Sequence, residues 1–233
     1  MSPPGSPEPL SLLRSAALVA GKDLRIELRA RVTTSQVLPF GGIVLLLAAL
    51  AADPDRAALA GVAPGMFWTA VLLAAVLAAG RSAALEAADG VRDGLRLSWL
   101  DPGGVFLGKV AALFVELTAL EAALLAVLVA VYDFRVAHPL LLVASAVSAT
   151  LGTSAVGVVY GAVAAAAHTR ETLLPLLALP VLTPEALGGT RAWTAAQQSG
   201  AGDGLRWVQL LTVFGCVLLV TGLATFGALL EED

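Results

Sequence analysis

Four long stretches of this chain contain no aspartate, glutamate, lysine or arginine. They are residues 32–52, 57–80, 139–167 and 207–230. A helix needs about 20 apolar residues to cross a hydrocarbon core about 30 Å thick, and each stretch is at least that long. Because backbone groups inside lipid must be paired within their own segment, these stretches predict membrane-spanning helices.

Two weaker candidates lie between them. Residues 110–132 are long enough but carry Glu116 and Glu121, and residues 172–190 contain three prolines. With both included, we expect an all-α, polytopic integral membrane protein of six transmembrane helices that forms one domain over residues 1–233. The prolines leave open a re-entrant hairpin in place of the fifth span, because broken helices are tolerated inside membrane bundles.

The composition supports a membrane protein independently. Hydrophobic residues make up 58% of the 233 residues and charged residues only 14%, whereas a soluble domain carries about a quarter charged residues. Six spans and their connections leave no room for a soluble catalytic domain. The single cysteine, Cys216, excludes an intrachain disulfide and a cysteine-rich metal site. Residues 1–9 lack a basic region followed by an apolar stretch, so we expect no cleaved signal peptide.

The basic residues predict the orientation. Ten of the 14 lie before the first span, between the second and third spans, or between the fourth and fifth. Since lysine and arginine accumulate in cytoplasmic loops, we expect a cytoplasmic N-terminus. With six spans, the acidic tail at residues 231–233 returns to the same side.

The segment before the first span, residues 10–31, has the pattern of an amphipathic helix. Such a helix would lie in the membrane interface, where basic side chains meet anionic lipid. The pattern fits a simple anchor and a specific contact with a partner equally well. Its apolar positions recur at steps of three or four residues, and its basic residues fall on another face: Leu10, Leu13, Ala17, Leu24 and Leu28, against Lys22, Arg25 and Arg29.

Residues 81–109 form the longest polar interruption on the predicted cytoplasmic side. Leu95, Leu97 and Trp99 give it more apolar content than a connector needs, and residues 101–104 (DPGG) are a turn signal. A short helix over residues 90–100 would offer an apolar and charged contact to another protein. A solvated loop whose apolar residues dip into the interface explains the composition equally well.

Two carboxyl groups within the third span are costly in lipid, at about 2.5–3.5 kcal/mol each. Five residues separate Glu116 from Glu121, which places them about 140° apart around a helix and makes them a poor acid–base or metal pair. For Glu116 we favour a hydrogen-bonded group in the bundle interior. Glu121 is either such a group or a substrate or proton site. His138 and His168 lie at span boundaries, where an interfacial position is favoured over a metal or heme ligand.

Small and hydroxyl-bearing residues gather in the fourth span. Serines and threonines between residues 145 and 154, together with Gly152, Gly157 and Gly161, predict close helix packing rather than catalysis. Gly157 and Gly161 form a GxxxG pattern. The sequence contains no HExxH, GxSxG or P-loop motif.

Several segments together resemble the CcmB family, the heme exporter permease of cytochrome c maturation. The matching stretches are KDLRIELRAR (22–31), the 81–109 loop with its FLGK entry to the third span (106–109), LGTSAVGVVYGA (151–162) and TRETLLPLLALP (169–180). The order and spacing of these segments carry the resemblance. Beyond Gly189 it is limited to hydrophobicity.

The resemblance implies an ABC-2-type permease, a subunit of an ABC transporter that acts in heme export for c-type cytochrome biogenesis. It implies an inner-membrane location and no cofactor bound by this chain, with ATP on a partner. It leaves open whether heme is the cargo of this chain or ATP hydrolysis instead releases a heme-loaded chaperone. The implied partners are a cytoplasmic CcmA-like ATPase, a second copy of the chain, a CcmC-like heme-handling membrane protein, a small single-span subunit and a heme chaperone. Membrane lipid surrounds the chain, and no nucleic acid is expected.

By the same resemblance, residues 81–109 would be the loop that couples the permease to the ATPase. The residues that match the family in that loop are Glu86, Gly90, Asp93, Gly94, Leu95 and Lys109. Two other classes of function stay open: an ABC-2-type permease that exports another lipid or a drug, and a membrane-embedded enzyme that uses Glu121 or a histidine.

Overall fold

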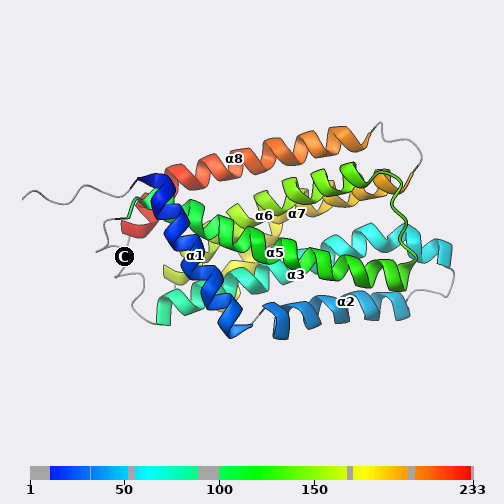
Figure 1. Ribbon diagram of the computed structural model, residues 1–233, viewed down its shortest axis with the longest axis horizontal. Helices are drawn as coiled ribbons and strands as arrows, with labels where there is room; N and C mark the ends of the chain where they lie inside the picture. Colours follow the sequence, from blue (N-terminus) through cyan, green and yellow to red (C-terminus); the bar gives the residue numbers. More distant parts are fainter. Residues whose placement is uncertain are drawn as a thin grey trace, which may run out of the picture.

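The computed structural model describes residues 11–31, 33–51, 56–88, 100–166, 170–198 and 203–231. Within these ranges the chain is helical and contains no strand, which confirms the all-α prediction (Figure 1). The elements are α1 (Leu12–Ala30), the π-helix η1 (Thr33–Val37), α2 (Leu38–Ala51), α3 (Arg56–Ala88), α5 (Pro102–Tyr132), α6 (Pro139–Ala166), α7 (Arg170–Gln197) and α8 (Gly204–Glu231).

The helices from α2 to α8 run along the long axis of one bundle, and successive helices alternate in direction (Figure 1). Helix α6 packs against α3, α5, α7 and α8, so it lies at the centre. Helix α1 crosses the bundle at the end where the C-terminus lies, and its main contact is α5. The predicted helix over residues 10–31 is therefore present, and it lies across the bundle rather than along it.

Within the described ranges, four helical segments are long and apolar enough to cross a membrane by themselves: Ala58–Ser82, Pro102–Tyr132, Pro139–Ala164 and Gly204–Leu229. A fifth span results if α1 and residues 35–51, which meet at 54°, count as one broken crossing. The chain is thus a multi-pass membrane protein, but the predicted number of six is not confirmed. Helix α2 has only 14 residues, and α7 contains two acidic and two basic residues.

Helix α7 is continuous through its three prolines. It runs for 28 residues, or about 42 Å at 1.5 Å per residue, and contains Pro175, Pro180 and Pro184. Proline lacks the N–H that an interior helical position donates, so each ring leaves one carbonyl without its usual partner. The alternative of a re-entrant hairpin is wrong, because the chain passes along the whole bundle as a single helix (Figure 1).

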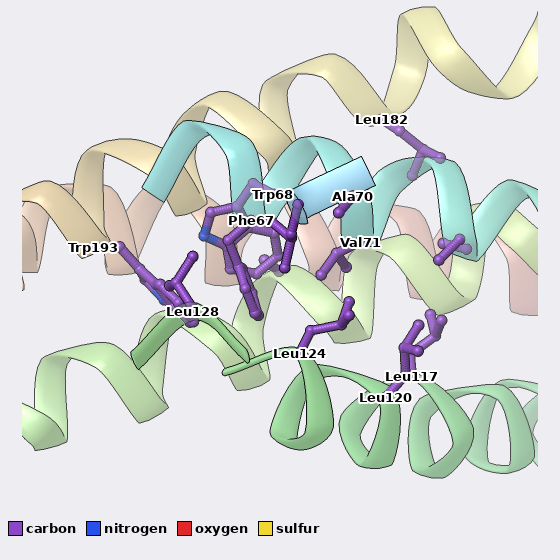
Figure 2. Packing of buried hydrophobic residues seen from close by; sticks show 14 of the residues in the cluster. Phe67, Trp68, Ala70, Val71, Leu117, Leu120, Leu124, Leu128, Leu182 and Trp193 are labelled. Atoms are coloured by element: carbon purple, nitrogen blue, oxygen red, sulfur yellow. The ribbon is translucent and has the colours of Figure 1, made fainter. Parts of the chain in front are cut away.

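An aromatic cluster joins α3 to α7 in the core. The rings of Phe67 and Trp193 stack with centroids 4.2 Å apart, and Trp68 meets Trp193 edge-on at 5.7 Å (Figure 2). A Cβ atom on Gly189 would overlap the Trp68 indole, so this glycine lets α7 approach α3. The α5–α6 connection is held against the last turn of α7, because the backbone N–H groups of residues 137 and 138 both donate to the Ala196 carbonyl.

The predicted close packing of α6 is present at Gly157. A Cβ atom there would lie 2.8 Å from the Leu113 side chain of α5 and 3.3 Å from Ala79 of α3. Gly215 of α8 lies against the backbone of α6, because a Cβ atom there would lie 3.3 Å from the Gly152 N and 3.3 Å from the Ser148 carbonyl oxygen. Small residues thus allow the helices to approach closely where lipid supplies no hydrophobic driving force.

Candidate functional site

The segment predicted as a coupling loop is mostly helical at its two ends. Helix α3 continues to Ala88 and α5 begins at Pro102, so the boundaries of 81 and 109 were wrong. Glu86 lies in α3 and Lys109 lies in α5. Arg81 and Lys109 were interpreted as marking the ends of the spans, whereas α3 continues past Arg81 and α5 begins before Lys109. Gly90, Asp93, Gly94 and Leu95 lie outside the described residues, as does all but the last residue of the short helix predicted over residues 90–100.

The DPGG sequence begins a helix and is not a free turn. Asp101 is the N-cap of α5, and its side chain accepts a hydrogen bond of 2.7 Å from the Gly104 N–H. Pro102 occupies the first turn, where a missing N–H costs nothing. An aspartate N-cap satisfies one of the N–H groups that a helix start leaves unpaired. The entry to α5 is therefore held at a defined residue.

Two glycines of α5 let α1 lie directly on its backbone. A Cβ atom on Gly104 would lie 2.5 Å from the Ser15 Cβ, and one on Gly108 would lie 2.6 Å from the Ala16 carbonyl oxygen. Ser15 is fully buried, and its Oγ accepts a 3.2 Å hydrogen bond from the Asp101 N–H. The amphipathic helix was expected to contact lipid or a partner. One side of it contacts the chain's own α5.

Lys109 was expected in a cytoplasmic loop, but it is buried in the α1–α5 contact with only 6% of its surface exposed. Its Nζ lies 3.9 Å from Asp23 Oδ2 of α1, and Asp23 also pairs with Lys22 at 2.6 Å. A buried charge is costly unless it is paired, so an ion pair with α1 offsets part of the cost of burying Lys109. The charged group of Lys109 therefore lies inside the contact between α1 and α5. We call this contact the α1–α5 joint; it is formed by Gly104, Gly108 and Lys109 of α5 and by Ser15, Ala16 and Asp23 of α1.

A small cavity lies beneath this joint, with a volume of about 40 Å³. Its polar lining comes from Lys109 and Glu116 of α5 and Ser82 of α3, and Asp23 and Glu27 of α1 are the charged neighbours of Glu116. The rest of the lining is small or apolar: Ala79, Leu113, Gly157, Val158, Gly161, Ala162 and Phe226. This volume suffices for about one or two water molecules beside polar groups. A porphyrin does not fit.

Glu121 points away from that cavity. It is 6% exposed and accepts a 2.6 Å hydrogen bond from the Thr150 hydroxyl of α6. Glu116 lines the cavity and Glu121 does not, so the two carboxyl groups do not form a pair. The role of Glu121 in transport stays a prediction.

A third carboxyl group, Glu185 of α7, was missed by the sequence analysis. It is 1% exposed, and neither carboxyl oxygen has a hydrogen-bond partner among the described residues. Its carboxyl group occupies the place that a Cβ atom on Gly152 of α6 would need. The signal was a lone acid directly after Pro184, inside a stretch predicted to span the membrane. The criterion that identified Glu121 would have found it.

The histidines gather no metal-binding group in the described part of the chain. His138 begins the turn into α6, with its Nε2 buried and without a hydrogen-bond partner among the described residues. His168 lies outside the described ranges. Within those ranges, no three or more His, Cys, Asp or Glu side chains come close enough together to hold a metal ion.

Comparison with known proteins agrees with the resemblance seen in the sequence. A model of the CcmB protein family matches residues 14–230, so the likeness extends well past Gly189. The heme exporter protein B of Rhodobacter capsulatus is 34% identical over 171 residues, which cover 72% of this chain and 77% of that protein. The heme exporter protein B of Paracoccus denitrificans is 30% identical over 212 residues, 89% of this chain and 93% of that protein. The chain belongs to the CcmB protein family.

Proposed function

We propose that this chain is the membrane permease subunit of a heme exporter complex that serves c-type cytochrome biogenesis. The family and the two relatives named heme exporter protein B support this function, as do the apolar helices of a multi-pass membrane protein. In the proposal the chain resides in the inner membrane with its N-terminus in the cytoplasm. Heme is the cargo, and ATP is bound and hydrolysed by a separate ATPase subunit.

The proposed complex contains a CcmA-like ATPase, a second copy of this chain, a CcmC-like heme-handling membrane protein, a small single-span subunit and a heme chaperone. The side of α1 that faces away from α5 supports a contact with lipid or a partner. Leu13 and Leu28 are 76% and 75% exposed there, and Arg25 and Arg29 are exposed beside them. An exposed apolar face flanked by basic side chains suits a membrane interface or an acidic partner.

The observation that carries the mechanism is the joint between α1 and α5. Gly104 and Gly108 bring the two backbones together, and Asp23 and Lys109 place opposite charges within the contact. Residues 89–101 connect α3 to α5 in the sequence, and α5 begins at Pro102, two residues before Gly104. We expect the ATPase to hold that connection, so that ATP binding moves α1 and α5 together and repacks the bundle between two arrangements. Such coupling requires that ATP binding favour one of the two arrangements of the bundle.

The test compares two identical substitutions. Gly108→Ala places a Cβ atom against the Ala16 carbonyl and separates α1 from α5, whereas Gly21→Ala on α1 meets nothing within 4 Å. In cells that depend on the complex, we expect Gly108→Ala to lower holocytochrome c by about tenfold while the purified complex still hydrolyses ATP. Gly21→Ala should leave both quantities at the wild-type level.

Wild-type holocytochrome c with Gly108→Ala, at equal amounts of membrane-inserted protein, would contradict the proposed coupling. Altered ATPase activity with normal holocytochrome c would instead favour a permease for another lipid or a drug. A membrane-embedded enzyme requires Glu121 or a histidine as a catalyst, so full function of Glu121→Gln, His138→Ala and His168→Ala would remove that class.

A further inference from the structure

The carboxyl group of Glu185 is enclosed where α6, α7 and α8 meet. All three helices pack on one another (Figure 1). A Cβ atom built on Gly152 of α6 would meet both the Glu185 carboxyl group and the Gly215 Cα of α8. The carboxyl group thus fills the space that two glycines leave open. At 1% exposure it cannot be reached by another protein chain.

No basic group faces this carboxyl group among the described residues. Helix α6 carries no charged residue, and the charged residues of α8, Arg206 and Glu231, lie about 14 Å and 24 Å along the helix from Gly215. On α7 itself, Arg191 is exposed, about 9 Å further along the axis and on another face. Helix α3 meets α7 at Trp68 and Gly189, about 18 Å or more along its axis from its own charged residues, Arg56, Arg81 and Glu86.

Helix α5 packs on the side of α6 opposite to Glu185, at nearly the same height along the α6 axis. Its Glu121 bonds to Thr150, and Thr150 and Gly152 are separated by about 200° around α6. The two acids therefore lie on opposite sides of α6, and α6 itself stands between them. They differ in one respect: Glu121 has a hydroxyl donor, whereas neither oxygen of Glu185 has a donor among the described residues.

An ionised carboxylate without water, a cation or a donor cannot persist in such a place, because its desolvation is not offset. A neutral carboxylic acid can. We propose that Glu185 is a proton-binding site that controls the packing of α6, α7 and α8. With the proton bound, the three helices close on one another. When the O–H bond breaks, the proton passes to water, and the carboxylate that remains draws water between the helices and separates them.

The packed arrangement therefore binds one proton more than an arrangement in which Glu185 is ionised and hydrated. Raising the pH favours the opened arrangement, and lowering it favours the closed one. Since the permease is proposed to alternate between arrangements, the proton would act as a ligand of one of them. This site is separate from the α1–α5 joint, and its test does not depend on the identity of the cargo.

The test measures the contact between α6 and α8 directly. The hydroxyl groups of Ser148 and Thr212 lie 2.9 Å apart on the exposed side of this contact. In membranes that contain the full chain with its partner subunits, Cys216→Ala removes the native thiol, and Ser148→Cys with Thr212→Cys supplies a disulfide pair. We expect the yield of this disulfide to fall roughly threefold or more, relative to Glu185→Gln, when the pH rises from about 6 to about 9.

Glu185→Gln keeps the shape of the side chain but cannot ionise, so it also corrects for the pH dependence of thiol oxidation. Glu121→Gln is the matched control on the other side of α6 and should retain the wild-type pH profile. If Glu185→Gln fails to insert, Glu185→Leu replaces it, with the same flat profile expected. Identical pH profiles with Glu185 and with either replacement would overturn the proposal, and so would loss of the pH dependence in Glu121→Gln alone.

Discussion

Asp101 shows how one side chain determines where a helix begins. Its carboxylate caps α5 at the Gly104 N–H, while its backbone N–H reaches Ser15 of α1. The side chain therefore holds the start of α5, and the backbone holds α1 to it. Any shift of this residue would disturb both helices at once.

We expect Asp101→Ala to lower the stability of the protein by about 1 kcal/mol, because the cap is lost and an N–H is left unpaired. Asp101→Asn keeps an oxygen that can accept the same hydrogen bond and should be close to the wild type. Thermal unfolding of the purified chain in mild detergent measures both. An Asp101→Asn protein as unstable as Asp101→Ala would show that the charge, and not the cap, is what matters.

At the scale of single residues, the sequence predicted the relative directions of side chains on one helix better than the neighbours that surround each side chain. It correctly indicated that Glu116 and Glu121 face different ways, because their separation along a helix is known without a structure. It misplaced Lys109, because a lysine at the end of an apolar stretch is typical of a loop. Only the docking of α1, 86 residues away from Lys109 along the sequence, explains why that lysine is buried.

At the scale of helices, close packing depends on which glycine faces which neighbour. Gly65 and Gly189 both lie in the contact between α3 and α7. A Cβ atom on Gly189 would overlap the Trp68 indole, whereas one on Gly65 would make an ordinary contact of 3.8 Å with Thr190. A glycine-to-alanine substitution therefore creates a clash at Gly189 and none at Gly65.

Gly189→Ala should lower the melting temperature, since overpacking a core costs about 1–3 kcal/mol. Gly65→Ala should leave it unchanged or raise it slightly, because alanine is favoured over glycine in a helix by roughly 1 kcal/mol. Melting curves of both variants and the wild type in the same detergent measure this difference in stability. Equal loss of stability at both positions would contradict the packing described for α7 against α3.

The positions of most helices were predictable because apolar stretches without charge have few alternatives in lipid. The continuous course of α7 was not, because three prolines in one stretch are equally compatible with a break. The length of α3 and the start of α5 were missed for a related reason. Charged residues mark the edge of the lipid, and a helix does not have to end there.

At the scale of the whole molecule, the helices from α2 to α8 alternate in direction, so α1 lies at the opposite end of the bundle from the end of α7 and the start of α8 (Figure 1). Ser11 before α1 and Gln198 after α7 are both exposed. In a Cys216→Ala background, a membrane-impermeant thiol reagent added outside spheroplasts should label Gln198→Cys and not Ser11→Cys. Labelling of Ser11→Cys from outside would reverse the orientation that the basic residues predict.

The proposed transport cycle depends on α1 and α5 moving together when the partner ATPase binds nucleotide. Spin labels can report this, because Leu28 of α1, Val115 of α5 and the native Cys216 of α8 are all exposed. One labelled copy per complex, with Leu28→Cys paired either with Val115→Cys (in a Cys216→Ala background) or with Cys216, gives two distances by pulsed electron resonance.

Between the nucleotide-free complex and the complex trapped with ATP and vanadate, we expect the α1–α5 distance to stay the same. The α1–α8 distance should shift by several ångströms, about the size of one helix turn at most. A changed α1–α5 distance, or no change in either distance while the complex hydrolyses ATP, would contradict the account.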